Sequence, residues 1–351
     1  MYQDFYKLTG KPFQLNPAPG YYFPSKGHKR AYAYLKYGVY EGEGFIVISG
    51  EIGAGKTTLV QALMGELDSK FIVAAQLVNT HIDATDLVRA VSDAFGLPVQ
   101  EASKQRLLTQ FESFLGSLAD SGRRALLIVD EAQNLSPPAM EELRMLSNFQ
   151  RGSHALLQSF LVGQPELREI LLAPSMTQLR QRIIASYHLG PLDRSETREY
   201  VLHRLGCVGW KGDPRLDDAI FDSLHAASGG LPRLINTFCH RLFLNACMSE
   251  SHVIGSADFT ETFNDLRDEI GAGSPRDSAA AAGRGSAQRG AGVVHPFLSS
   301  AVTTRLDRIE KTLGTAVDLL QQITGEEGKS PAAAAAGKQR FRFGGRAQGN
   351  S

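Results

Sequence analysis

Residues 50–58 of this chain read GEIGAGKTT and follow directly on the apolar run FIVIS. Gly50, Gly53 and Gly55 permit backbone angles that other residues avoid, and a helix-forming segment, KTTLVQALMGEL, begins at once. A glycine loop between a buried strand and a helix N-terminus gathers free backbone N–H groups at the positive end of the helix dipole, which suits a phosphate chain. The stretch therefore predicts a strand–loop–helix unit that binds phosphate.

The same stretch matches the P-loop pattern G-x-x-x-x-G-K-[ST]. In this pattern the loop amides cradle the phosphates, Lys56 neutralises the β and γ oxygens, and the hydroxyl of Thr57 ligates Mg²⁺. We therefore expect ATP and Mg²⁺ as ligands. The expected nucleotide-binding residues of the loop are Gly50, Glu51, Ile52, Gly53, Ala54, Gly55, Lys56, Thr57 and Thr58.

A second apolar run, ALLIVDE, ends in two acids. Asp130, at the tip of the expected strand, is placed to hold the metal together with Thr57. Glu131 follows, where a carboxylate can polarise an attacking water. Acids often end strands simply because a loop begins there, but an acidic pair joined to a P-loop predicts nucleotide hydrolysis.

Short apolar strands alternate with helical patterns between residues 45 and 190. The expected strands are FIVIS, FIVAAQLV, ALLIVD, ALLQSFLVG and IASYHL, and helices are expected at 86–95, 107–119 and 140–148. Such alternation predicts an α/β fold with a mainly parallel sheet covered by helices on both faces. FIVIS and ALLIVD are apolar almost throughout, as central strands buried on two sides are.

The rest of the chain divides by composition. Residues 1–44 are expected to form a linker and a helix that packs on the α/β core, and residues 191–270 a small all-helical domain. Residues 271–296 are rich in Gly, Ala, Ser and Arg and predict a flexible linker. Residues 297–325 contain a heptad seam and are expected to form a helix, and residues 326–351 are expected to form a disordered basic tail. The seam consists of Val302, Leu306, Ile309, Leu313, Ala316, Leu320 and Ile323.

The charge balance and the hydropathy of the chain indicate which classes of partner and which cellular compartment to expect. Lys+Arg and Asp+Glu are both 37, so the zero net charge gives no support for nucleic-acid binding, and we expect no nucleic-acid partner. The N-terminus has no basic region followed by an apolar stretch, so we expect no signal peptide, and no apolar run approaches the roughly 20 residues of a membrane span. We therefore expect a cytoplasmic protein, compatible with peripheral association at the inner membrane. Three cysteines without metal-ligand spacing are expected to be buried free thiols: Cys207, Cys239 and Cys247.

Three further features fit an ATPase that works as a ring. Gln164 ends FLVGQ, a strand expected beside the acidic one, where its amide can orient the attacking water. Arg180 and Arg182 precede the last strand, and one of them is expected to reach a neighbouring subunit's γ-phosphate as an arginine finger. Arg233, in GGLPRLIN, is expected near a helix N-terminus over the nucleotide. A solvated side chain or a local ion pair is the alternative for each.

Dispersed motifs resemble the AAA+ ATPases of the general secretion pathway A (ExeA-like) group: KPFQLNP…YYF, GEIGAGKTTL, LLIVDEAQNL, EELRMLSNF, FLVGQPELR, LRQRI and GGLPRLIN. The stretches GEGFIVISGEIGAGKTTL, AQLV and LLQSFLVGQPEL…QLRQRIIASYHLGPL are most similar to its branch associated with exosortase (PEP-CTERM) and exopolysaccharide gene clusters. The resemblance covers about residues 1–270. It implies a five-stranded sheet at 45–190, a helical lid at 191–270, and ATP hydrolysis coupled to envelope export or assembly.

The resemblance stops after the lid. Secretion-type members continue into a membrane span and a peptidoglycan-binding domain, whereas this chain continues into the linker, heptad helix and basic tail, so cell-wall binding is not implied. We expect a homo-oligomeric ring whose heptad helix docks on export or exosortase-cluster proteins. Two alternatives stay open: a DNA-linked ATPase of the transposition-regulator or origin-binding kind, and a slow nucleotide-gated scaffold.

Overall fold

A computed structural model describes residues 1–271 of the chain, except residues 17–18, 79, 81 and 101–102. The linker, heptad helix and basic tail expected after residue 271 lie outside the described residues.

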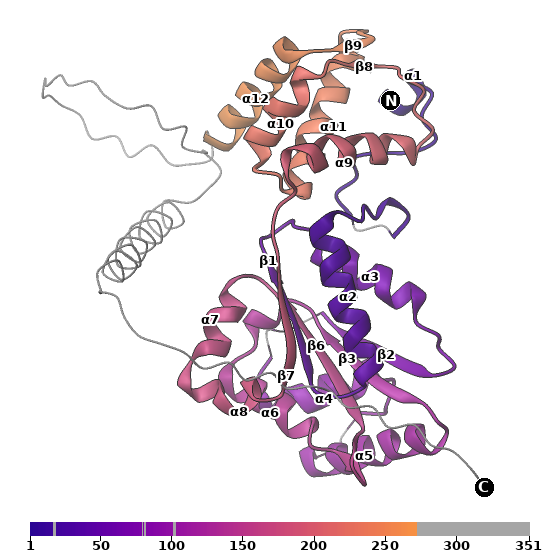
Figure 1. Cartoon of the computed structure of the whole chain (residues 1–351), viewed down its shortest axis with the longest axis vertical. Helices are drawn as coiled ribbons and strands as arrows, with labels where there is room; N and C mark the ends of the chain where they lie inside the picture. Colours follow the sequence, from indigo (N-terminus) through magenta and orange to yellow (C-terminus); the bar gives the residue numbers. More distant parts are fainter. Residues whose placement is uncertain (17–18, 79, 81, 101–102, 272–351) are drawn as a thin grey trace, which may run out of the picture. The chain divides into compact units, whose positions relative to one another are not determined.

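Five parallel strands form one sheet, as expected, in the order β2-β3-β6-β1-β7 (Figure 1). The strands are β1 (Phe45–Gly50), β2 (Ile72–Leu77), β3 (Arg124–Val129), β6 (Leu157–Gly163) and β7 (Ile183–Leu189). β1 and β6 are buried along their whole length, and β3 is buried from its second residue, because helices cover both faces of the sheet there. In contrast, β7 alternates partly buried and exposed residues, since it lies at an edge of the sheet.

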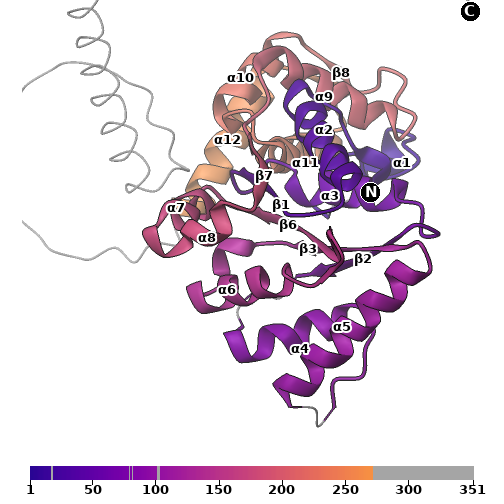
Figure 2. The same cartoon turned by 60° about the horizontal axis from the view of Figure 1, so that its bottom comes forward.

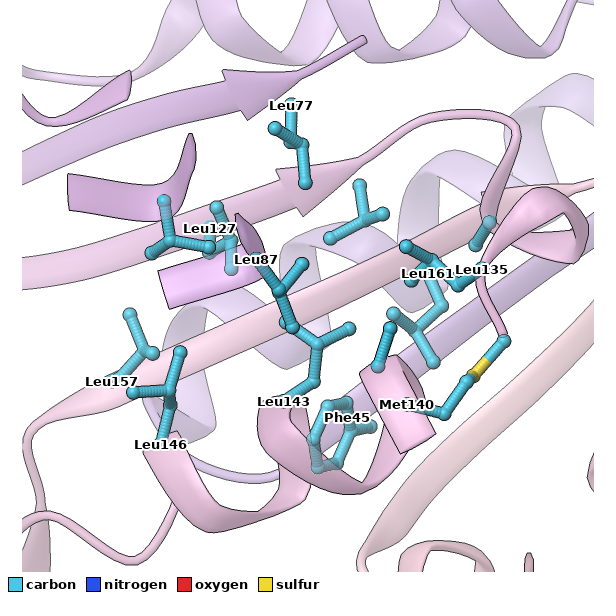
Figure 3. Packing of buried hydrophobic residues seen from close by; sticks show 14 of the residues in the cluster. Phe45, Leu77, Leu87, Leu127, Leu135, Met140, Leu143, Leu146, Leu157 and Leu161 are labelled. Atoms are coloured by element: carbon cyan, nitrogen blue, oxygen red, sulfur yellow. The ribbon is translucent and has the colours of Figure 1, made fainter. Parts of the chain in front are cut away.

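The pleat of the strands sends alternate side chains into two hydrophobic cores. Phe45, Val47, Leu127 and their neighbours face one core, shown in Figure 3, which is closed by the helices after β2 and β3. Ile46, Ile48 and their neighbours face the other core.

Figure 2 shows the two helical layers on opposite sides of the sheet. On the first side lie α4 (Ala84–Ala94), α5 (Lys104–Asp120), α6 (Pro137–Leu146), α7 (Glu166–Leu172) and α8 (Thr177–Arg180); on the second lie α2 (Lys26–Glu41) and α3 (Lys56–Glu66). The expected helices at 86–95, 107–119 and 140–148 correspond to α4, α5 and α6 with shifts of one to three residues at their ends. Smaller elements are the β4 (Gln150–Arg151) and β5 (His154–Ala155) hairpin and three 3-10 turns, η1 (Pro19–Tyr21), η2 (Ala132–Asn134) and η3 (Pro174–Met176).

Beyond β7 the chain forms the helices α9 (Arg194–Gly206), α10 (Ala219–Ser228), α11 (Pro232–Met248) and α12 (Ser256–Gly271). They enclose buried side chains such as Phe238, Leu242 and Phe243. The expected helical character is observed, with one addition: the two-residue strands β8 (Arg215–Leu216) and β9 (Val253–Ile254) pair in parallel. We refer to α9–α12 with this strand pair as the lid.

The N-terminal segment, residues 1–44, was expected to pack on the α/β core, but only part of it does so. α2 packs on the sheet as expected, but α1 (Tyr2–Phe5) and the residues after it pack on the lid. The rings of Tyr2 and Phe13 lie 6.0 and 5.3 Å from that of Phe243, and Thr9 N–H donates to Val208 O. The reason is apolar burial, since these aromatic side chains find their partners on α11 rather than on the sheet.

The cysteine prediction is right for two residues of three. Cys239 and Cys247 are buried free thiols, and burial raises the pKa of the Cys239 thiol. Cys207 is exposed, contrary to expectation, because it follows the last turn of α9 at the lid surface. None of the helices in the described part of the chain is long and apolar enough to cross a membrane.

Candidate nucleotide site

The loop between β1 and α3 adopts backbone angles that require glycine. Gly53 has φ +84°, and Gly55, which caps the N-terminus of α3, has φ +97°. Side chains at such angles are strained. Gly53 also has no room for a side chain, because a Cβ there would lie 2.5 Å from the Cβ of Arg233 on the lid. The loop therefore sits at the carboxyl edge of the sheet, in contact with the lid.

Lys56 is the first residue of α3 and is 6% exposed. Its Nζ donates to Gly50 O at 2.8 Å and to Glu51 O at 3.0 Å. Burial lowers the pKa of Lys56, and the nearby carboxylates of Glu131 and Asp130 oppose that shift. The ammonium group thus lies folded over the loop, at the place where the sequence predicts phosphate.

Thr57 and Asp130 are joined directly. Thr57 Oγ1 donates to Asp130 Oδ2 at 3.1 Å, and the N–H of Glu131 donates to Asp130 Oδ1 at 3.0 Å. Burial raises the pKa of Asp130, while these two donors oppose the rise. A hydroxyl and a carboxylate oxygen side by side are the hard ligands that Mg²⁺ prefers, so the residues fit the metal that the motifs imply.

Glu131 is held by two glutamines. Its Oε2 accepts from Gln133 Nε2 at 2.6 Å and from Gln164 Nε2 at 2.9 Å. Burial by itself raises the pKa of Glu131, but the two amides and the charge of Lys56 outweigh it, so the pKa lies below its usual value. The carboxylate is therefore ionised near neutral pH and is suited to act as a base.

The backbone around Glu131 is equally constrained. Glu131 has φ +50°, a left-handed angle that is uncommon for a residue with a side chain. Its carbonyl accepts from Thr80 Oγ1 at 3.0 Å, and Gln133 Oε1 accepts from the N–H of Gln164 at 2.9 Å. β3 and β6 are neighbours in the sheet, which is why Gln164 reaches Glu131. Gln133 was not singled out in the sequence, although its place two residues after Glu131 in a tight turn is a usable signal.

Replacing Gln133 with leucine should slow turnover about tenfold, because one hydrogen bond to a charged group is lost. The carboxylate of Glu131 loses a donor that lowers its pKa, so the acid limb of the kcat profile should move to higher pH. The profile is measured from pH 5 to 9, with exposed Gln178→Leu as the control. A profile identical to the parent's would mean that Gln133 does not position Glu131.

A pocket of about 370 Å³ lies over the loop, between the α/β core, residues 14–16 and the lid. Its walls include Lys56, Thr57 and Glu131 from the core and Tyr200, Arg204, Arg233 and Asn236 from the lid. The backbone N–H of Arg233 donates to Gly53 O at 3.2 Å, and its exposed side chain lines the pocket. Of the predicted residues, Lys56, Thr57 and Glu131 of the core and Arg233 of the lid thus line the same cavity.

Arg204 was not predicted, yet it organises one wall. It is 7% exposed, and its guanidinium donates to Gln14 O at 3.1 Å, to the Tyr200 hydroxyl at 3.1 Å and to Pro12 O. The ring of Tyr21 lies 4.8 Å from its Cζ. Arg204 therefore joins the N-terminal segment to the lid beside the pocket. Its position on the buried face of α9 is the feature by which the sequence could have identified Arg204.

Arg180 and Arg182 lie apart from this pocket. Both precede β7, whereas the loop lies at the carboxyl ends of the parallel strands. Arg182 Nη1 donates to Ser147 O at 3.1 Å and to Ser147 Oγ at 2.9 Å, and Arg180 Nη1 donates to the carbonyls of Leu171 and Leu172 at 3.2 Å. The structure thus places neither arginine at the nucleotide pocket of its own chain.

Comparisons with known proteins agree with this geometry. Residues 39–171 match a family model described as AAA domain. General secretion pathway protein A of Aeromonas hydrophila is 39% identical over 265 residues, which cover 74% of this chain and 47% of that protein, so the chain spans about half of the relative's length.

Two solved structures share the fold. Cdc6p of Pyrobaculum aerophilum has a TM-score of 0.58 at 15% identity, covering 76% of this chain and 75% of that one. The Aeropyrum pernix ORC1 protein, solved in complex with DNA, has a TM-score of 0.53 at 14% identity, covering 70% and 65%. At 14 and 15% identity these likenesses show the fold alone, and neither supports the expected exclusion of nucleic acid. Residues 39–171 therefore match an AAA domain, and over 265 residues the chain, with its P-loop sequence and five-stranded α/β fold, is similar to general secretion pathway protein A.

Proposed function

We propose that this protein hydrolyses ATP to ADP and phosphate with Mg²⁺. The observation that carries the proposal is the Glu131 carboxylate, held ionised by Gln133 and Gln164 beside the joined Thr57 and Asp130 oxygens. A base, a metal-ligand pair and a buried cation then meet at one phosphate-binding loop. These are the parts that phosphoryl transfer to water requires.

Each part has a separate task. The loop amides of residues 50–58 bind the phosphate chain, and Lys56 neutralises its β and γ oxygens. Thr57 and Asp130 would hold Mg²⁺, which when bound would neutralise charge on the phosphate chain. Glu131 accepts a proton from the attacking water, and Gln164 keeps the carboxylate, and with it the water, in line. Arg233 closes the pocket from the lid.

We further propose that the active form is a homo-oligomeric ring. Arg180 and Arg182 lie at the opposite end of the strands from the loop, so either can serve as a finger only for a neighbouring subunit. A head-to-tail interface repeated around a ring provides that geometry. The finger stabilises the charge that develops on the transferred phosphate.

Mixing two inactive variants tests the shared site. Lys56→Ala protein keeps its fingers, and Arg182→Ala or Arg180→Ala protein keeps its phosphate-binding loop. In a random one-to-one mixture about a quarter of the interfaces join an intact finger to an intact loop. We expect the mixture with the true finger variant to recover about that share of the parent ATPase rate. Turnover per subunit should also rise with concentration. No recovery with either arginine variant, together with a rate independent of dilution, would exclude the shared site.

The relative's name leads to the proposed biological role. Since the chain is related to general secretion pathway protein A, we propose that ATP turnover drives or regulates assembly of an envelope export system, of the secretion or exosortase/exopolysaccharide type. In that role the protein acts in the cytoplasm at the inner membrane, and the heptad segment, outside the described residues, recruits export proteins. The likeness to the Aeropyrum pernix ORC1 protein shows the fold alone at 14% identity, so it does not favour the DNA-linked alternative over envelope export.

A further inference from the structure

His28 lies in the first turn of α2, next to the phosphate-binding loop. It is 5% exposed, and a Cβ on Gly55 would lie only 2.8 Å from its Nε2. The imidazole therefore touches the loop from the side of α2, which lies beside α3 over the same face of the sheet (Figure 1). Lys56 and Thr57, the residues that follow Gly55, are on the pocket side.

The hydrogen bonds around His28 define its tautomer. Ser25 Oγ accepts from the backbone N–H of His28 at 3.2 Å and lies 2.7 Å from its Nδ1. Burial lowers the pKa of His28 to about 4, so the ring is neutral near pH 7 and carries a single N–H. The Ser25 hydroxyl can donate its own proton to Nδ1, and we assign the tautomer in which it does so and the ring N–H is on Nε2.

We assign the Ala54 carbonyl as the partner of that N–H, because Nε2 lies against Gly55, at the Ala54–Gly55 peptide. A hydrogen bond with the Ala54 backbone raises the pKa of His28, which only a carbonyl acceptor does. The N–H of Ala54 is already used, since it donates to Glu51 O at 3.1 Å. In a trans peptide the carbonyl and the following N–H point in opposite directions. Anchoring the Ala54 carbonyl on His28 therefore turns the Gly55 N–H toward the pocket.

The position of His28 is itself well supported. Ser25 caps α2, and Glu196 of the lid helix α9 accepts from the N–H of Lys26 at 2.7 Å. The same carboxylate accepts from the N–H of Asp193 at 3.1 Å, so it joins the start of α2 to the start of α9. The first turn of α2 is thus tied to the lid on one side and contacts the loop through His28 on the other.

We propose that His28 is a positioning residue of the nucleotide site, which holds the Ala54–Gly55 peptide so that the Gly55 N–H donates to a phosphate oxygen. The proposal rests on nucleotide binding as proposed above. It explains why a buried histidine, 27 residues before Gly55 in sequence, lies against this glycine, which lines the pocket.

The test compares ADP binding by the parent protein and three variants, measured by isothermal titration calorimetry in Mg²⁺ buffer. His28→Leu removes the donor, and we expect ADP affinity to fall about tenfold because a phosphate donor is no longer oriented. His28→Gln keeps an N–H at similar reach and should bind within about threefold of the parent. Partly buried His240→Leu, on the lid beside Tyr2, is the matched control and should bind as the parent does.

Steady-state kinetics give the second measurement. Because the Gly55 N–H contacts phosphate both before and during the reaction, His28→Leu should raise KM for ATP and leave kcat within about twofold. Rescue by His28→Gln, with this split between KM and kcat, supports the proposal. Parent-like ADP affinity in folded His28→Leu overturns it, as does equal loss in His28→Gln and His240→Leu.

Two further results distinguish a failure of the role of His28 from a failure of nucleotide binding itself. If the parent itself does not bind ADP, nucleotide binding fails as a whole. If His28→Leu does not fold, Ser25→Ala decides, because it leaves the ring in place but removes the hydroxyl that orients Nδ1. We expect about threefold weaker ADP binding for Ser25→Ala, and unchanged affinity overturns the role of His28.

Discussion

Replacing Glu131 with glutamine should lower kcat for ATP hydrolysis by about two to three orders of magnitude, because the general base is lost. The amide keeps nearly the same shape, so ATP binding should stay within about twofold of the parent. The phosphate contacts of Lys56 and the loop are untouched. The expected result is a protein that holds ATP without turning it over, measured by phosphate release and by equilibrium binding.

The matched control is Glu112→Gln, which removes one exposed carboxylate from α5, away from the pocket. It should turn over ATP as the parent does. Equal rates for Glu131→Gln and the parent would remove Glu131 from the proposed role, and the paired glutamines would then be structural. Loss of both binding and turnover in Glu131→Gln would instead show that the strained turn at residue 131 needs the carboxylate to form.

Replacing Lys56 with alanine should weaken ATP binding about tenfold to a hundredfold, since hydrogen bonds to charged groups contribute about 1.5–3 kcal/mol each. Hydrolysis should fall further than binding, because charge on the phosphate oxygens shifts during the reaction and the ammonium no longer offsets it. The ATP affinity is measured by binding titration, and the rate of hydrolysis by single-turnover kinetics. The site remains otherwise intact, which distinguishes this variant from Glu131→Gln.

Lys29→Ala is the control for charge removal, because Lys29 is exposed on α2 and its side chain does not line the pocket. It should leave both affinity and rate unchanged. If Lys56→Ala bound ATP as tightly as the parent, the Lys56 ammonium would serve only to bind the carbonyls of Gly50 and Glu51. The phosphate site would then not be at this loop.

The sequence alone was sufficient for the features that depend on local backbone preference. Apolar runs such as FIVIS and ALLIVD predicted buried parallel strands, and all five expected strands appear in the sheet. Gly50, Gly53 and Gly55 predicted backbone angles that other residues avoid; Gly53 and Gly55 adopt left-handed angles, whereas Gly50 is the last residue of β1. Such features are visible in sequence because residue type determines which backbone angles and which burial pattern are accessible over a few neighbours.

The tertiary structure alone decided which distant residues meet. The strand of Gln164 was expected beside the acidic one, but the bonds of Gln164 and Gln133 to Glu131 are seen only in the fold. His28 meets Gly55 because α2 lies beside α3. Arg204 joins the lid to residues 12–14, and the first residues of the chain pack on the lid rather than on the sheet. These contacts follow from the order of strands and the packing of whole faces, which short-range periodicity does not encode. The sequence therefore identified the phosphate loop and its acids, and the fold supplied the residues that hold them in place.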